Sequence, residues 1–117
     1  MLYDGAIRFL EQACQGFALD DPQEFNQRIH NNVQRAQAII NELNLALDMS
    51  AGGDFSANQR RLYNYLDRRL QESNLQKNEP GIREVIQRLT VLRDAWAEML
   101  RNHHGSPAAP LAGVRAA

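Results

Sequence analysis

The sequence predicts an all-α protein, an antiparallel up-down four-helix bundle. Apolar residues recur at a spacing of three to four through most of the chain, which is the period of an amphipathic helix and not of a half-buried strand. Glycine and proline cluster at three internal breaks, near residues 16–22, 52–53 and 78–81. Short breaks between long helices make successive helices antiparallel neighbours, as in an up-down bundle.

Length and composition narrow the class of protein. The chain has 117 residues, enough for one domain, and its 13 basic and 14 acidic residues leave a net charge of −1. This balance disfavours a nucleic-acid partner, which usually requires a basic excess. A single cysteine excludes an internal disulfide, and no apolar run approaches the roughly 20 residues that span a bilayer. We therefore expect an intracellular protein without membrane insertion.

Two helices are expected in the first half of the chain. The first is about four turns long, with an apolar stripe formed by Tyr3, Ala6, Ile7, Leu10, Cys14 and Phe17. The second begins with Asp20 or Asp21 as N-cap and Pro22 in its first turn. Its apolar stripe is formed by Phe25, Ile29, Val33, Ala36, Ile40, Leu43 and Leu47. We expect it to end at Gly52-Gly53, because glycine readily adopts the left-handed conformation of a helix C-terminus.

The third and fourth helices complete the expected bundle. The third begins with Asp54 or Ser56 as its cap and runs to about Leu75. The fourth begins near Pro80 and carries an apolar heptad seam formed by Ile82, Val85, Ile86, Leu89, Leu92, Trp96 and Met99. Residues 1–104 are thus expected to form the bundle, and the Ala-, Pro- and Gly-rich residues 105–117 a disordered tail.

The patterns typical of enzymes and metal centres do not occur in this sequence. None of His30, His103 and His104 is preceded by glutamate three positions earlier, the pairing that a di-iron bundle requires. Cys14 lies on the apolar stripe of the first helix, where a buried, inert thiol is the usual state. Gly52-Gly53 lacks the rest of either nucleotide-binding fingerprint. We expect no enzymatic activity, no metal and no cofactor.

Charge and surplus apolar residues suggest a binding surface. Residues 1–53 carry seven acidic and three basic residues, a net charge of −4, whereas residues 54–117 carry seven acidic and ten basic residues, a net charge of +3. The basic excess fits either a solvated helix face or the rim of a groove. Ile39, Leu45 and Val91 lie beside the main apolar seams. Such a wide apolar face serves either deeper burial or a groove for partner helices.

Four segments occur in order over residues 2 to about 100: Leu2-Tyr3-Asp4-Gly5-Ala6-Ile7-Arg8-Phe9-Leu10, Asn31-Asn32-x-x-Arg35-Ala36-Gln37-x-Ile39-Ile40, Asn58-x-x-x-Leu62-Tyr63-x-Tyr65 and Leu89-x-x-Leu92-Arg93-x-Ala95-Trp96. In their order and spacing they resemble the FliS-type flagellin export chaperones. The resemblance implies a bacterial cytoplasmic chaperone that binds the disordered C-terminal segment of flagellin, prevents its premature polymerisation and assists its delivery to the flagellar export gate. It also implies a segment ahead of the Leu-Tyr-Asp-Gly signature, which this sequence lacks.

The expected flagellin-binding groove lies on the second and third helices. It comprises ten residues, Ile29, Asn32, Ile39, Ile40, Leu43, Leu47, Leu62, Tyr65, Leu66 and Leu70. The apolar members would bury the partner, and Asn32 would form a hydrogen bond with its backbone. Helical period does not separate core from groove, so the set combines both. The alternative is a structural bundle without a client, which would self-associate as a homodimer through the same apolar surplus.

Overall fold

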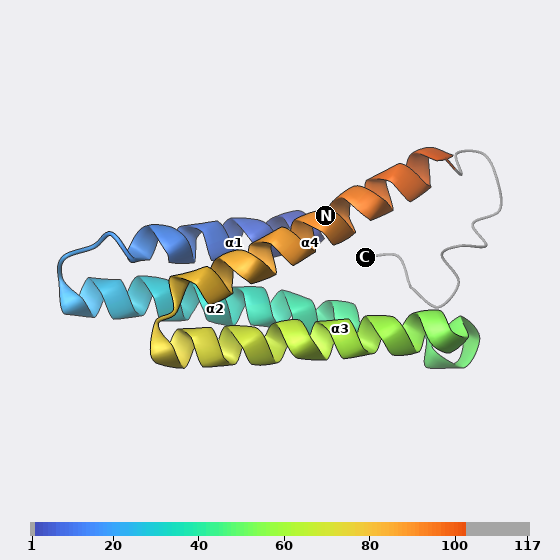
Figure 1. The fold of residues 1–117 in the computed structure, drawn as a ribbon, viewed down its shortest axis with the longest axis horizontal. Helices are drawn as coiled ribbons and strands as arrows, with labels where there is room; N and C mark the ends of the chain where they lie inside the picture. The colour runs from blue at the N-terminus through green and yellow to red at the C-terminus, as the bar shows by residue number, and fades with distance from the viewer. Residues whose placement is uncertain (1, 103–117) are drawn as a thin grey trace.

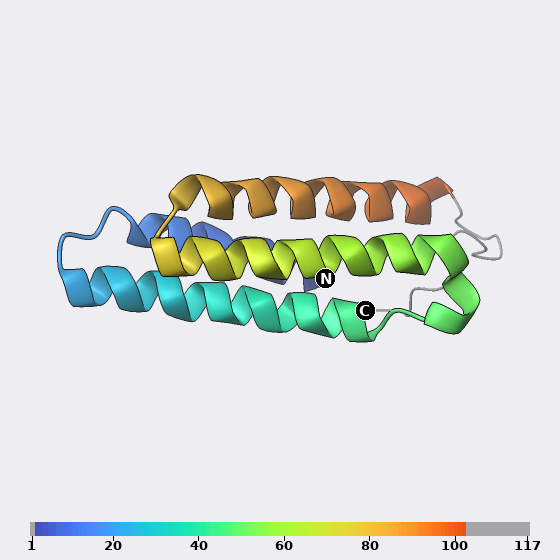
Figure 2. The same cartoon turned by 60° about the horizontal axis from the view of Figure 1, so that its bottom comes forward.

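The computed structural model describes residues 2–102 and contains four α-helices within that range (Figure 1). They are α1 (Leu2–Gly16), α2 (Pro22–Leu45), α3 (Met49–Gln76) and α4 (Glu79–Asn102). Each helix packs against the next along the chain, and α4 packs against α1, so that the helices form a ring around one core (Figures 1 and 2). The expected four-helix bundle is confirmed. The expected disordered tail, residues 105–117, lies outside the described residues.

Two glycines allow α1 and α2 to approach closely. A Cβ atom on Gly5 would lie 3.3 Å from Cδ1 of Ile39, and one on Gly16 would lie 2.7 Å from Cγ of Arg28. The helix also contributes Tyr3, Leu10 and other apolar residues to the core. The helix has the four turns expected from its apolar stripe.

The start of α2 is as predicted, but its end is not. Asp21 is the N-cap, and its Oδ2 accepts a hydrogen bond from the Glu24 amide at 3.0 Å. The helix ends at Leu45 instead of at Gly52-Gly53. The reason is Asp48, whose Oδ1 accepts hydrogen bonds from both the amide and the hydroxyl of Ser50, at 3.2 and 2.7 Å. These hydrogen bonds cap the N-terminus of α3, which therefore begins at Met49, before Gly52-Gly53.

The glycine pair instead lies within α3. Gly53 has φ = 53° and ψ = −130°, which kinks the helix one turn after its start. This left-handed φ is readily adopted by glycine because it lacks a Cβ atom. The expected cap residue Ser56 is buried and donates its hydroxyl to the Asp48 carbonyl at 3.0 Å. The first turn of α3 is therefore folded back onto the end of the loop that precedes it.

A Schellman turn joins α3 to α4. Lys77 adopts φ = 51°, the Asn78 amide donates to the Ser73 carbonyl at 2.9 Å, and the Lys77 amide donates to the Asn74 carbonyl. A Cβ atom on Gly81 would lie only 2.1 Å from the Ser73 Oγ. The two helices therefore touch through a glycine just after the turn.

The core contains one polar pair that crosses the bundle. Tyr3 of α1 and Tyr63 of α3 are almost fully buried, and their hydroxyl oxygens lie 2.6 Å apart in a hydrogen bond. Burial is the main cause that raises the pKa of both phenols, so both stay protonated. The pair fixes the start of α1 against the middle of α3.

We predict that Gly81→Ala destabilises the fold by about 1–3 kcal/mol, because the new methyl group overlaps Ser73 and forces α3 and α4 apart. Gly5→Ala is the matched control, since its methyl group meets only the flexible end of Ile39. Urea unfolding followed by circular dichroism measures both variants. Equal stability of Gly81→Ala and the wild type would contradict the close contact.

A second prediction concerns the tyrosine pair. Tyr3→Phe and Tyr63→Phe should each lower the free energy of unfolding by about 1–3 kcal/mol, because each leaves a buried hydroxyl without its partner. The double variant should cost less than the sum of the two single variants. Thermal and urea unfolding of all four proteins tests this cycle, and strict additivity would show that the hydroxyls are not coupled.

Candidate functional site

The structure divides the ten expected groove residues into two groups. Seven are buried in the bundle, with side chains at most 6% exposed: Ile29, Asn32, Ile40, Leu43, Leu47, Leu66 and Leu70. The six apolar members pack in the core of the closed bundle and offer little surface to a partner, whereas Asn32 lies at the edge of a pocket. The other three, Ile39, Leu62 and Tyr65, are only partly buried. Leu62 and Tyr65 lie together on α3, whereas Ile39 packs against Gly5 of α1.

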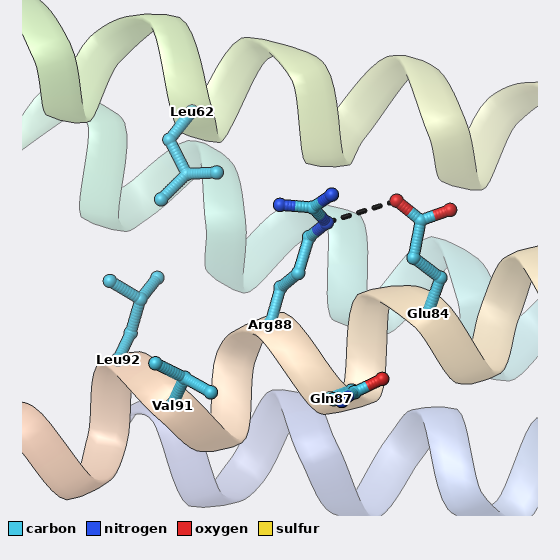
Figure 3. Close-up of a pocket in the computed structure, with 6 residues that line it drawn as sticks. All are labelled: Leu62, Glu84, Gln87, Arg88, Val91 and Leu92. Atoms are coloured by element: carbon cyan, nitrogen blue, oxygen red, sulfur yellow. Dashed lines mark hydrogen bonds and ion pairs between the residues drawn. The ribbon is translucent and has the colours of Figure 1, made fainter.

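Leu62 belongs to a surface groove between α3 and α4. We call this the α3/α4 groove; its volume is about 340 Å³ and its lining residues are Leu62, Glu84, Gln87, Arg88, Val91 and Leu92 (Figure 3). Leu62 extends from α3 toward Leu92 of α4, and Val91 lies beside Leu92. Val91 is 62% exposed. The middle of the groove is therefore apolar and open to solvent.

A charged cluster borders the α3/α4 groove on the side of the turn. Glu84 accepts hydrogen bonds from the Tyr65 hydroxyl at 2.6 Å, from Arg88 Nε at 2.9 Å and from Arg69 Nε at 3.0 Å. The hydrogen bond from Tyr65, followed by that from Arg88, lowers the pKa of Glu84 to about 2. The guanidinium of Arg88 also lies 5.3 Å from the centre of the Tyr65 ring. These contacts hold the polar end of the groove in one arrangement.

The apolar seam of α4 changes from buried to half-exposed along its length. Ile82, Val85 and Leu89 are fully buried, whereas the later seam residues Leu92, Trp96 and Met99 are only partly covered. An ion pair between Arg93 and Asp4, at 3.2 Å, marks where α4 passes the start of α1. Beyond this pair α4 extends past α1 (Figure 1). Its last turns thus present apolar side chains next to the groove.

Asn32 has an unusual position among the expected site residues. Its side chain is 4% exposed, and its Nδ2 donates to the Arg28 carbonyl at 2.8 Å. Its Oδ1 is buried and has no hydrogen-bond partner among the described residues. A buried acceptor left unpaired costs about 1–3 kcal/mol of folding free energy. Asn32 also lines a second pocket, on the α2 side of the molecule.

Only part of the α3/α4 groove could be predicted from the sequence. Leu62 was in the expected set, and Val91 was recognised as surplus to the apolar seam. Glu84, Gln87 and Arg88 were missed, because charged and amide residues on an exposed helix face give no signal of their own. A usable signal was the spacing of four between Glu84 and Arg88, which forms an ion pair on one helix face.

Residues 2–102 contain neither a candidate metal centre nor a membrane-spanning helix. No cluster of three or more histidine, cysteine, aspartate or glutamate side chains is placed there to hold a metal ion. No helix of that range combines the length and apolar character needed to cross a membrane. Cys14 is buried, and burial raises the pKa of its thiol, which keeps it protonated.

Comparison with known proteins identifies the family. The family model described as flagellar protein FliS matches residues 1–103. The flagellar secretion chaperone FliS of Bacillus subtilis is 34% identical over 110 residues, which cover 91% of this chain and 78% of that protein. Its counterpart in Campylobacter jejuni is 35% identical, covering 87% and 77% of the two chains. The Salmonella typhimurium counterpart is 30% identical, and the match covers 85% of this chain and 71% of that protein. This chain belongs to the FliS family of flagellar secretion chaperones, which is a family of chaperones and not of enzymes.

Proposed function

We propose that this chain binds the disordered C-terminal segment of flagellin in the bacterial cytoplasm, prevents its premature polymerisation and assists its delivery to the flagellar export gate. The observation that carries the proposal is the α3/α4 groove together with the half-covered apolar face of α4 beside it. Membership of the flagellar secretion chaperone family supports it. The partner would bind as an amphipathic helix in a groove.

The apolar surface suits a client that is disordered before it binds. Ordering a flexible segment costs about 1–2 kcal/mol per residue, so a long surface is needed to offset that cost. The α3/α4 groove supplies Leu62, Val91 and Leu92, and the surface continues along α4 to Met99. Apolar groups placed there contribute about 25 cal/mol for each Å² removed from water. A segment held along this line cannot pack against another flagellin subunit at the same time.

The expected binding residues take two roles in this proposal. Leu62 and Tyr65 contact the client directly, because they lie at the α3/α4 groove and its charged end. Ile39 offers a partly exposed apolar contact on α2. The six buried apolar members hold the helices that form the groove: Ile29, Ile40, Leu43, Leu47, Leu66 and Leu70. Asn32 would supply a hydrogen-bond acceptor for the client backbone once α2 and its neighbours part, because its Oδ1 is buried in the closed bundle.

Val91→Asp is the sharpest test of the α3/α4 groove. We expect it to weaken binding of a labelled flagellin C-terminal segment by about tenfold or more, because the client would have to desolvate a charge in an apolar groove. Leu75→Asp, a similarly exposed leucine on α3 outside this groove, is the matched control and should bind as the wild type does. Fluorescence anisotropy measures affinity, and circular dichroism checks folding.

Unchanged affinity of Val91→Asp would remove this groove from the site. Sedimentation with and without flagellin separates the proposal from a structural bundle without a client. A complex of one chaperone with one flagellin supports the chaperone function. A stable homodimer whose mass does not change when flagellin is added would contradict it.

A further inference from the structure

The turn between α3 and α4 carries the only lysine of the chain in an unusual backbone conformation. Lys77 has φ = 51°, in the left-handed region where glycine is the usual residue after a helix. Its side chain is partly exposed and turns back toward α3, where Nζ donates a hydrogen bond to Oδ1 of Asn74 at 2.7 Å. The amine is therefore held against the last turn of α3 instead of extending freely into water.

The hydrogen bonds of Asn74 fix the position of this amine. Asn74 is 7% exposed, and its Nδ2 lies 2.9 Å from Nδ1 of His30 on α2. An amide nitrogen only donates, so Nδ1 of His30 is the acceptor and the amide oxygen faces Lys77. Hydrogen bonds thus run from Lys77 through Asn74 to His30. Because both ends of the amide are used, Asn74 cannot rotate away from the lysine without losing both bonds.

Lys77 also lines a pocket between α2 and α3, with a volume of about 330 Å³. No carboxylate is among the residues that line it, and neutral amides form much of its wall: Asn26, Gln34, Gln37 and Gln71. In the part of the chain that the structure describes, Lys77 forms no ion pair. Burial lowers the pKa of Lys77, because the ammonium loses hydration and gains no opposite charge nearby.

An amine in this position can act as a nucleophile. Neutral lysine attacks activated carbonyl groups, and loss of hydration is one of the ways in which proteins activate it. The pocket beside Lys77 has room for a small acyl group, and its amide walls offer N–H donors to the oxygens of a leaving group. The other 12 of the 13 basic residues are arginines, which stay protonated and do not react in this way.

We propose that Lys77 is an acylation site, at which an acyl phosphate transfers its acyl group to Nζ. The amine attacks the carbonyl carbon and forms an amide, and the bond between that carbon and the phosphate oxygen breaks. Inorganic phosphate leaves with the electron pair, and one amine proton passes to water. The product has lost the charge of the ammonium but keeps one N–H, which can still donate to Asn74.

This site is separate from the α3/α4 groove, because the two share no lining residue. The proposal therefore does not depend on the proposed function, and its test needs no client. The acyl group would extend toward the pocket between α2 and α3, where the hydrogen bond from Asn74 to His30 joins the turn to α2.

Acetyl phosphate is the probe, and mass spectrometry of the intact protein follows the acetyl groups added per chain over time. Three proteins are compared at one pH: the wild type, Lys77→Arg and the double variant Lys77→Arg/Arg68→Lys. Lys77→Arg gives the background from the terminal amino group. Position 68 is exposed on α3, with Glu72 one turn later, so a lysine relocated there stays hydrated and charged. Peptide mapping assigns each acetyl group to a residue.

We expect Lys77 to be acetylated about threefold faster or more than the relocated lysine, because more of it is neutral at a given pH. In urea, where the pocket is lost, the two lysines should react at equal rates. If Lys77 in the folded protein reacts no faster than the relocated lysine, or does not react, the turn is not an acylation site. A rate difference that persists in urea would also contradict the proposal, because neighbouring residues in sequence and not the pocket would then cause it.

Discussion

The contact between α1 and α4 determines how far the closed core of this bundle extends. A four-helix core is covered on all sides only where four helices are present. On the turn side of the Arg93–Asp4 ion pair, α4 buries Val85 and Leu89 completely, and beyond it the same apolar seam is half-exposed at Trp96. The proposed client surface is therefore a continuation of the core, formed by residues of the same type and spacing.

The edges of the ring differ in the chemistry that closes them. The α2–α3 edge is joined by amide hydrogen bonds, such as Asn44 to Asn64 at 2.9 Å and Asn74 to His30 at 2.9 Å. Gln37 donates to Asp67 and Arg60 to the Asn44 carbonyl along the same edge, so side-chain hydrogen bonds connect α2 and α3 over most of their length. The α3–α4 edge is ionic at the turn, around Glu84, and apolar beyond it. This division leaves the α3/α4 groove open next to a rigid, charged end.

Helix identity and the start of α2 were predictable from the sequence, whereas the start of α3 and the division of core from groove were not. Asp21 and Pro22 marked the start of α2 through local backbone chemistry, which needs no tertiary contact. Ile39 and Ile40 are adjacent and chemically identical, yet Ile40 is 1% exposed and Ile39 only partly buried. Their difference arises from which helices pack beside α2, and the period of one helix does not contain that information. The left-handed glycine expected at Gly52-Gly53 is present at Gly53, but it kinks α3 instead of ending α2, because capping by Asp48 starts a helix before it.

The buried, unpaired oxygen of Asn32 has an energetic consequence for the free chaperone. An isolated bundle selected for stability alone would be better served by leucine at this position, because an unpaired buried acceptor costs about 1–3 kcal/mol. This cost would fall only where α2 and its neighbours part far enough for a donor to reach the oxygen, because the atom is buried in the closed bundle. A disordered client regains its chain entropy when it leaves, and under the proposed function this gain would favour its release. Such a balance would suit the proposed role, in which flagellin is protected and then released for export.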